Sequence, residues 1–418
     1  MPLGSLFSSK SRTCLIAVSI ATKAVVMTLT PMSLELAFLM SQVTYPSKWD
    51  LTPYGKMMEY IFKLWQAIPV DHPVLATSWT VEVFKASTGL YLLVFMEKFP
   101  LLILDFVTGL LLYQILLREG LSEKKASIGF FLWFLNPYVI VVNQMWAAID
   151  LIPTLLLLLS IFFVQARKPL RGAVAFGAAI AAKLFPVLLL PIFASIGKRS
   201  KFTLAFVTST VLGVGAYFAW VAYAGFNPGF QLQQYDPFMQ YFEDYAVVTS
   251  NGAHIGLATV ALIVVYAFVA EKWPRTSERL YEPVLMAFLV WFALSNWFPQ
   301  FLMWMIPLLI IDGIVSEKKH WVFTVILLST ALFLDVFALY PYFTANGHAF
   351  FFIPADTAAL RQAVAAFESL ANDIIIVGLA EPIARDLFTF TCLIYMLKIA
   401  AERTGLNSAL SSLLRRRT

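Results

Sequence analysis

The sequence predicts an all-α polytopic membrane protein of about twelve membrane-embedded helices. Two observations come from the composition: 60% of the 418 residues are hydrophobic and only 13% are charged. A soluble domain carries roughly twice that charged share. The third observation is that basic residues gather in short clusters between apolar runs. The chain therefore has too little polar surface to cover a water-soluble globule, and most of its surface is expected to face lipid.

The basic clusters set the expected topology. Lys and Arg between apolar runs favour the cytoplasmic side of a membrane, so every cluster is assigned to the cytoplasm, together with both termini. This also accounts for the net charge of +5 without a nucleic-acid partner. The clusters are Lys10 and Arg12; Arg118, Lys124 and Lys125; Arg167, Lys168 and Arg171; Lys198, Arg199 and Lys201; Lys272, Arg275 and Arg279; Lys318 and Lys319; Lys398, Arg403 and Arg415 to Arg417.

With this topology the apolar runs alternate across the membrane. The first run, residues 13–30, follows basic residues as a signal peptide does. It lacks a small-residue cleavage site, so it is interpreted as a signal anchor that stays. Further single spans are expected at residues 99–117, 127–144, 150–164, 202–224, 255–270, 321–337 and 388–400.

Two segments are expected to form helical hairpins with short arms. Residues 172–196 have basic clusters on both sides, and a single crossing would put one cluster on the wrong side. A hairpin with its apex at residues 183–186 avoids this conflict, and Pro186 disfavours a continuous helix there. Residues 283–295 and 301–314 form the second pair. Arms this short must be shielded by protein, because lipid does not tolerate irregular backbone.

Two long segments are expected on the outer face, residues 32–95 and 342–388. Each contains an amphipathic run, residues 54–67 and 357–371, that would lie along the membrane interface. No linker or fixed-period repeat is visible, so residues 1–418 are interpreted as one domain. The two cysteines lie in apolar runs, which excludes a disulfide framework. The four histidines never pair at metal-ligand spacing.

Polar residues at the outer ends of the spans are the candidates for function, because ionisable groups at membrane depth are costly. These residues also have non-functional explanations: a carboxylate can lie in a solvated loop, and Lys183 can extend its ammonium group to the membrane surface. Asp105, in the middle of a span, is interpreted as a buried structural partner. No phosphate-binding glycine loop or serine nucleophile motif is visible, so nucleotide-driven transport is not expected. The candidates are Glu35, Asn143, Gln144, Asp150, Lys183, Asn296 and Gln300.

Several stretches, taken in order, carry a resemblance to a known family. They are Glu35 directly after the first span; Glu97-Lys98-Phe99 through Asp105 and Gly109; Phe134-Leu135-Asn136-Pro137 followed by Ala148-Ile149-Asp150; Lys183-Leu184-Phe185-Pro186 with Pro191; and, more weakly, Gln300 to Trp304 with Pro307. Together they resemble the GT-C superfamily of polyprenyl-phosphate-sugar-dependent glycosyltransferases. Within it, the likeness is to the first mannosyltransferase of glycosylphosphatidylinositol (GPI) synthesis and its archaeal and bacterial relatives.

The resemblance implies a GT-C-like fold. It also implies transfer of a sugar, with mannose as the first candidate, from a polyprenyl or dolichyl phosphate to a lipid-linked or glycolipid acceptor, with inversion at the anomeric carbon. The family's acidic Asp-x-Asp pair appears here as Ser33-Leu34-Glu35. Glu35 is therefore the first candidate for the general base, and Asp50 is the second. Lys183 would meet the leaving phosphate on the extracytoplasmic or lumenal side.

The other candidates are expected to bind substrate: Asp150 and Gln300 orient hydroxyl groups, and Asn143, Gln144, Asn296 and Trp304 complete the set. No organic cofactor is implied, and a divalent metal is left open.

Two other functions compete with the glycosyltransferase. Short hairpins interrupted by proline also occur in transporters, so a lipid-sugar transporter or flippase is one alternative. The missing carboxylate of the acidic pair makes an inactive scaffold subunit the other. The candidate polar residues gather at one face rather than at the membrane midplane, and no repeat relates the two halves of the chain. Both observations favour the enzyme over the carrier.

Overall fold

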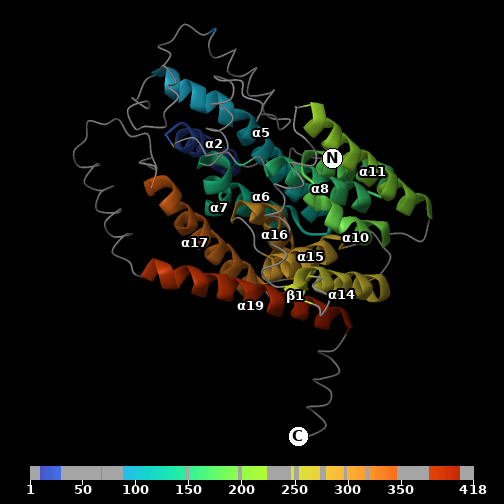
Figure 1. Ribbon diagram of the computed structural model, residues 1–418. Coiled ribbons are helices and arrows are strands. Elements are labelled where there is room, and N and C mark those ends of the chain that lie inside the picture. The colour runs from blue at the N-terminus through green and yellow to red at the C-terminus, as the bar shows by residue number, and fades with distance from the viewer. Residues whose placement is uncertain are drawn as a thin grey trace, which may run out of the picture.

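The computed structural model describes residues 10–29, 67, 88–145, 148, 150–195, 200–223, 246–248, 254–273, 279–295, 299–316, 320–345 and 376–404. In this part of the chain the secondary structure is almost entirely helical, as predicted, and the helices pack into one bundle (Figure 1). A pair of three-residue strands was not predicted. These strands, β1 (Ala246–Val248) and β2 (His254–Gly256), run antiparallel.

Three of the described helices are each long and apolar enough to cross a membrane: α2 (Lys10–Leu29), α5 (Thr88–Arg118) and α11 (Ser200–Tyr223). A fourth crossing is made if a bent pair of helices counts as one span. Shorter apolar helices fill the rest of the bundle. The chain is thus an integral membrane protein, whereas the count of twelve embedded helices and the GT-C arrangement stay predictions.

The bent pair corresponds to the span predicted at residues 127–144. Its first part is α6 (Glu123–Phe134), and the second is α7 (Pro137–Val139) continued by the π-helix η2 (Ile140–Met145), at an angle of 42°. Asn136 begins the second part, where its side-chain Oδ1 accepts a hydrogen bond of 3.0 Å from the Tyr138 amide. Pro137, which lacks an N–H, takes the first position of the new helix. The Asn-Pro pair therefore breaks the span.

The first predicted hairpin is present. Helix α9 (Pro169–Ala182) ends at Lys183, whose backbone is extended, and the chain continues as the 3-10 helix η3 (Phe185–Leu189) and α10 (Leu190–Ser195). The second arm folds back on the first, since the ring centroids of Phe176 and Phe193 are 4.7 Å apart. The break falls at the predicted apex.

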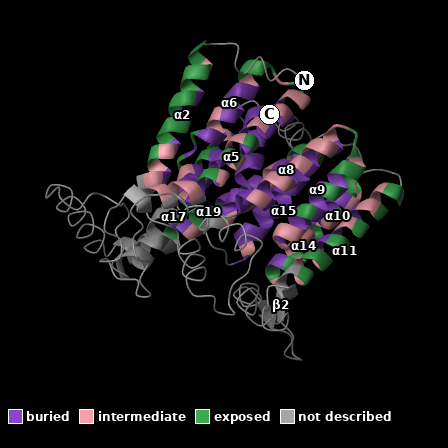
Figure 2. Ribbon diagram, turned by 90° about the horizontal axis from the view of Figure 1, so that it is seen from above, coloured by how far each residue is buried: buried purple, intermediate pink, exposed green. Residues whose placement is uncertain are grey.

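The second pair of short arms lies at the centre of the bundle. Helix α15 (Tyr281–Leu294) is joined to α16 (Ile306–Val315) through the 3-10 helix η4 (Pro299–Trp304). Nearly every residue of α15 and α16 is buried, whatever its position on the helix, and Figure 2 shows α15 as a buried segment. Around them lie α5, α6, α14 (Leu257–Lys272), α17 (Trp321–Ala345) and α19 (Ile376–Thr404), and α8 (Leu151–Gln165) contacts the connecting η4. Protein, rather than lipid, therefore shields these short arms, as expected.

Two helices begin earlier than their predicted spans. Helix α5 begins at Thr88, inside the predicted outer loop 32–95. The span was predicted to begin after the charged residue Lys98, but Lys98 lies within the helix. Lys98 is buried, and its Nζ donates a hydrogen bond of 2.8 Å to the Met145 carbonyl. Helix α19 begins at Ile376, inside the predicted loop 342–388. Its buried residues recur at helical spacing, as Ala384, Phe388, Cys392, Tyr395 and Ile399.

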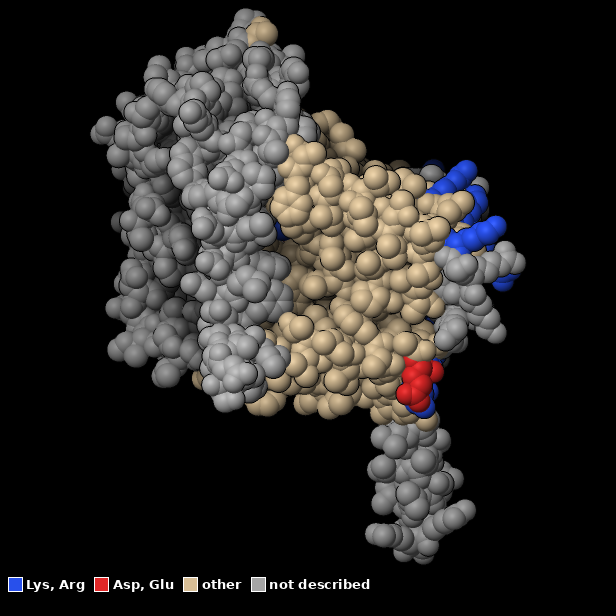
Figure 3. Space-filling model, turned by 45° about the vertical axis from the view of Figure 1, so that its right-hand side comes forward, with Lys and Arg blue, Asp and Glu red and all other residues tan. Residues whose placement is uncertain are grey.

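The exposed surface is largely apolar, as a lipid-facing surface should be. In Figure 3 a broad uncharged face adjoins an edge where Lys and Arg side chains gather. Helix α11 shows the same character, because only 17% of its span is buried. Its outward residues include Leu204 and Leu212, which are 65% and 67% exposed. Both predicted amphipathic runs, residues 54–67 and 357–371, lie outside the described residues apart from Ala67.

Helices α9 and α11 touch backbone to backbone at Gly177. A Cβ atom there would lie 2.6 Å from the Ser209 carbonyl oxygen, closer than real contacts allow. We expect Gly177→Ala to lower the free energy of unfolding by about 1–3 kcal/mol, measured by thermal unfolding in detergent. Gly215→Ala on α11 is the matched control, since its Cβ would meet nothing within 4 Å. Equal melting temperatures for the two variants would contradict this close packing.

Candidate active site

Two antiparallel helices of nearly equal length bring Asp150 and Lys183 together. Helix α8 has 15 residues and α9 has 14, and a short turn at Ala166–Lys168 joins them. Asp150 precedes α8 and Lys183 follows α9, so both lie at the end opposite the basic turn. Lys183 Nζ is 2.6 Å from Asp150 Oδ1. Asp150 is fully buried, whereas 31% of the Lys183 side chain is exposed.

Aromatic rings form a wall beside this ion pair. Trp304, at the end of η4, donates a hydrogen bond of 2.9 Å from Nε1 to the same Asp150 oxygen. Phe185 stacks on Trp304 with their ring centroids 3.4 Å apart, and Phe301 stacks on Trp304 at 4.8 Å. The Lys183 ammonium lies 4.4 Å from the centroid of the Phe301 ring, within the range of a cation–π contact. Because Phe185 belongs to the first hairpin and Trp304 to the second pair of short arms, their stacked rings connect the two hairpins.

Polar atoms without a partner mark the same region. Within the described part of the chain, the second carboxylate oxygen of Asp150 is buried and accepts no hydrogen bond. Asn143, fully buried, has no partner for either atom of its amide group among those residues. Such groups are rare in native proteins, because each loses its hydration without compensation. Asp150 and Asn143 therefore offer hydrogen-bonding capacity to a polar ligand.

The turn that carries Asn143 and Asp150 is held from several sides. The Ala148 amide donates a hydrogen bond of 3.0 Å to the Val142 carbonyl, which closes the turn. Lys98 binds the Met145 carbonyl, as described above. Gln144 points back to α5, where its Nε2 donates a hydrogen bond of 3.1 Å to Asp105 Oδ2. This contact gives Gln144 a place in the support of the turn.

Asp105 is the buried structural partner that the sequence predicted. It is fully buried, and its carboxylate pairs with Lys23 of α2. The backbone carbonyl of Asp105 accepts a hydrogen bond of 3.1 Å from Trp133 Nε1. Asp105 thus links α2, α5, α6 and the π-helix. Through its contact with Gln144 it supports the turn that contains Asn143, and it does not line the site.

The predicted site residues divide into three groups, one of which is Gln144 alone, whose side-chain amide contacts Asp105. Asp150, Lys183 and Trp304 meet, and Asn143 lies on the same turn as Asp150. Glu35, Asp50 and Asn296 lie outside the described residues, as does the side chain of Gln300, whose backbone belongs to η4. Their roles stay predictions.

Sequence reasoning missed the aromatic wall of Phe185 and Phe301, although both residues lie inside the quoted stretches. It also missed the hydrogen bond of Lys98.

In the described part of the chain, no group of three or more His, Cys, Asp and Glu side chains is placed to hold a metal ion.

Comparisons with known proteins point to one group of enzymes. The chain is 25% identical over 217 residues to GPI mannosyltransferase 1 of Saccharomyces cerevisiae, covering 49% of this chain and 51% of that protein. It is 28% identical over 95 residues to GPI mannosyltransferase 1 of Candida albicans. It is 31% identical over 83 residues to GPI alpha-1,4-mannosyltransferase I, catalytic subunit, of Danio rerio.

The first match spans about half of the relative's length, and the other two span 24% and 21%. No family model and no solved structure matches the chain. The resemblance noted in the motifs is confirmed at this level: over about half of its length, the chain is similar to GPI mannosyltransferase 1.

Proposed function

We propose that this protein is a membrane mannosyltransferase. It moves a mannose from a polyprenyl or dolichyl phosphate to a hydroxyl group of a lipid-linked or glycolipid acceptor, with inversion at the anomeric carbon. The likeness to GPI mannosyltransferases supports the reaction class. The reaction takes place at the end of the bundle that carries Asp150, Lys183 and Trp304, on the extracytoplasmic or lumenal side.

The observation that carries the proposal is the group formed by Asp150, Lys183 and Trp304. A fully buried carboxylate holds an ammonium group at 2.6 Å and keeps one oxygen without a partner among the described residues. Stacked aromatic rings lie beside the ammonium group. Such a group matches a donor that combines a phosphate, an apolar lipid chain and a sugar. The phosphate meets the cation, and the sugar hydroxyls meet the polar atoms.

The proposed reaction is a single displacement. A carboxylate, Glu35 first and Asp50 second, takes the proton of the acceptor hydroxyl. The acceptor oxygen then forms a bond to the anomeric carbon as the bond from that carbon to the phosphate oxygen breaks. The lipid phosphate leaves with the electron pair, and Lys183 stabilises its added negative charge. The donor is already activated, so no nucleotide takes part.

The position of the site supports its assignment to the outer side. Helices α8 and α9 run from the basic turn at Arg167, Lys168 and Arg171 to the pair Asp150–Lys183. A helix of 15 residues rises about 22 Å, most of the thickness of the apolar core of a bilayer. With basic residues in the cytoplasm, the pair lies near the opposite surface.

The deciding experiment measures sugar transfer by the purified protein. Radiolabelled dolichyl-phosphate sugars are supplied one at a time with native lipid extract as the source of acceptor. The expected result is a labelled glycolipid formed from dolichyl-phosphate mannose. Glu35→Gln is expected to lower the rate on the order of 10²-fold while donor binding persists.

Glu271→Gln serves as the matched control, because 69% of the Glu271 side chain is exposed and it is distant in sequence from the site. Its transfer rate should equal that of the wild-type protein. Loss of transfer in Asp50→Asn alone would assign the general base to Asp50. If the wild-type protein consumes no donor of the panel, the mannosyltransferase proposal is wrong.

A further inference from the structure

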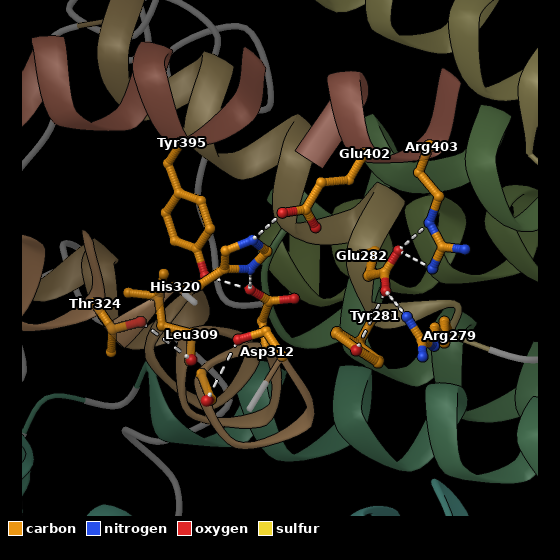
Figure 4. Close-up of polar contacts among 12 residues, drawn as sticks. Arg279, Tyr281, Glu282, Leu309, Asp312, His320, Thr324, Tyr395, Glu402 and Arg403 are labelled. Carbon is orange, nitrogen blue, oxygen red and sulfur yellow. Dashed lines mark hydrogen bonds and ion pairs between the residues drawn. The ribbon is translucent and has the colours of Figure 1, made fainter. Parts of the chain in front are cut away.

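A second polar site lies at the other end of the central helices. Helix α16 begins beside Trp304 and ends at a cavity of about 470 Å³. The cavity opens between α15, α16, the start of α17 and the last turns of α19, and its polar lining includes Arg279, Glu282, Asp312, His320, Glu402 and Arg403 (Figure 4). None of these residues belongs to the proposed transfer site. The cavity therefore needs its own explanation.

One side of the cavity is an arginine group, formed by Arg279, Glu282 and Arg403. The Glu282 carboxylate binds the Arg403 guanidinium through two nitrogen atoms, with Nε at 2.7 Å. Arg279 reaches the other oxygen of Glu282 at 3.3 Å. Two guanidinium groups thus share one carboxylate, so the cavity lining on this side keeps one positive charge in excess. The Glu119 carboxylate also acts on Arg279, but Glu119 does not line the cavity. Arg279 is also 51% exposed, so its remaining N–H groups are open to a ligand.

The backbone of Arg279 is also unusual. Its φ angle is +51°, in the left-handed region that a residue with a Cβ atom occupies at a cost of roughly 1–2 kcal/mol. Glycine would adopt this conformation freely, yet the chain carries an arginine there, and its side chain points to the Glu282 carboxylate (Figure 4). Arg167, in the turn between α8 and α9, adopts the same conformation with a φ angle of +58°. The conformation of Arg279 therefore supports the site only together with its contact to Glu282.

The other side is a carboxylate group, formed by Asp312, His320 and Glu402. His320 Nδ1 lies 2.5 Å from Asp312 Oδ2, and its Nε2 lies 3.3 Å from Glu402 Oε1. A ring with a carboxylate at each nitrogen favours the doubly protonated imidazolium. Burial disfavours that charge, but Asp312 and Glu402 outweigh the burial and raise the pKa of His320 above its ordinary value. Two carboxylates around one imidazolium leave one negative charge in excess.

The positively charged arginine group and the negatively charged carboxylate group lie at two sides of the cavity, and each has a solvent-exposed member. Arg279 exposes part of its guanidinium, and Glu402 exposes 35% of its side chain. The buried members, Glu282, Asp312 and His320, keep these two in place. A simple anion would match only the arginine group, and a simple amine would match only the carboxylate group. A ligand with one negative and one positive charge matches both.

We propose that this cavity binds a phosphoethanolamine group, with its phosphate at Arg279 and Arg403 and its ammonium group at Glu402. The group can come from the headgroup of a membrane phospholipid or from the free soluble compound. The lipid source fits the surroundings, because Val315 and Ile399 add apolar lining beside the polar residues. Two of its lining residues, Arg279 and Arg403, also belong to the basic clusters that the sequence assigns to the cytoplasmic side. This site is independent of the proposed sugar transfer.

The test measures lipid binding by the full-length protein in detergent, using native mass spectrometry. Short-chain phosphatidylethanolamine, phosphatidylcholine and phosphatidylglycerol are titrated separately. The wild-type protein should bind the ethanolamine lipid about tenfold more tightly than the other two. Phosphatidylcholine keeps the positive charge but offers no N–H donor, and phosphatidylglycerol has no positive charge. Free phosphoethanolamine is then added as a competitor. Displacement of the lipid by the free compound indicates the soluble source, and continued binding of the lipid indicates the lipid source.

Two variants assign the two ends of the ligand. Arg279→Gln should weaken binding of the ethanolamine lipid about tenfold. Glu402→Gln should remove the preference for ethanolamine over glycerol. Lys272→Gln is the matched control, because Lys272 is an exposed cation of the nearby α14 that does not line the cavity. Equal binding of all three lipids by the wild-type protein would overturn the proposal, as would unchanged binding in both cavity variants.

Discussion

Asp150→Asn is expected to lower the rate of mannose transfer on the order of 10³-fold while the protein still folds. Asparagine keeps the shape of aspartate, and its side-chain oxygen can still accept the Trp304 hydrogen bond of 2.9 Å. What the variant loses is the charge that fixes the Lys183 ammonium group at 2.6 Å. A freely moving ammonium group no longer meets the leaving phosphate at a fixed position, so the transition state loses stabilisation. Single-turnover transfer from labelled donor measures the effect.

A second variant separates the site from the fold. Lys183→Gln removes the cation from a side chain that is 31% exposed, and it should lower the rate to a similar extent. Asp386→Asn is the matched control, because Asp386 is an exposed aspartate of α19 and should be silent. The melting temperature of each variant is recorded in the same detergent. Near-wild-type transfer by Asp150→Asn would show that this ion pair has no part in the reaction.

The sequence predicted Asp150 and Lys183 at the same face of the membrane but did not predict that they pair, although local rules are enough to derive the pair. Two apolar runs of similar length, joined by a short basic turn, must be antiparallel neighbours, so the residues that flank them meet at the far end. The break at Lys183 follows equally from Pro186 and from the basic residues on both sides. In both cases the deciding residues lie within a few dozen positions of one another.

The contact of Trp304 with Asp150 could not be derived in this way. These residues are 154 positions apart, and no local pattern states which hairpin packs on which. The cavity at the other end of α16 was missed for the same reason. Asp312 lies inside an apolar run, where a carboxylate indicates a buried partner or a functional site. Its partners His320 and Tyr395 come from separate segments, and Glu402 in turn contacts His320. The signal was present, and only the fold supplies the partners.

Removing one partner of the buried pair Lys23–Asp105 is expected to have the largest effect on stability. Both side chains are almost completely buried, at 1% and 0% exposure. Lys23→Met leaves the Asp105 carboxylate with the Gln144 amide and no opposite charge. Breaking such a pair typically costs about 3–5 kcal/mol, because the remaining charge stays buried without compensation. Thermal unfolding of the purified protein in detergent should show a large fall in the melting temperature.

The double variant Lys23→Met, Asp105→Leu tests the cause. If the uncompensated charge is responsible, removing both charges should restore much of the lost stability, since an apolar pair carries no desolvation cost. The coupling free energy from the double-mutant cycle should then be large and favourable to the pair. Additive losses would instead mean that the two residues act separately, and that α2 is held to α5 by apolar packing alone. Because Asp105 also binds Gln144, the outcome decides whether α2 contributes to holding the turn of Asn143 and Asp150 in place.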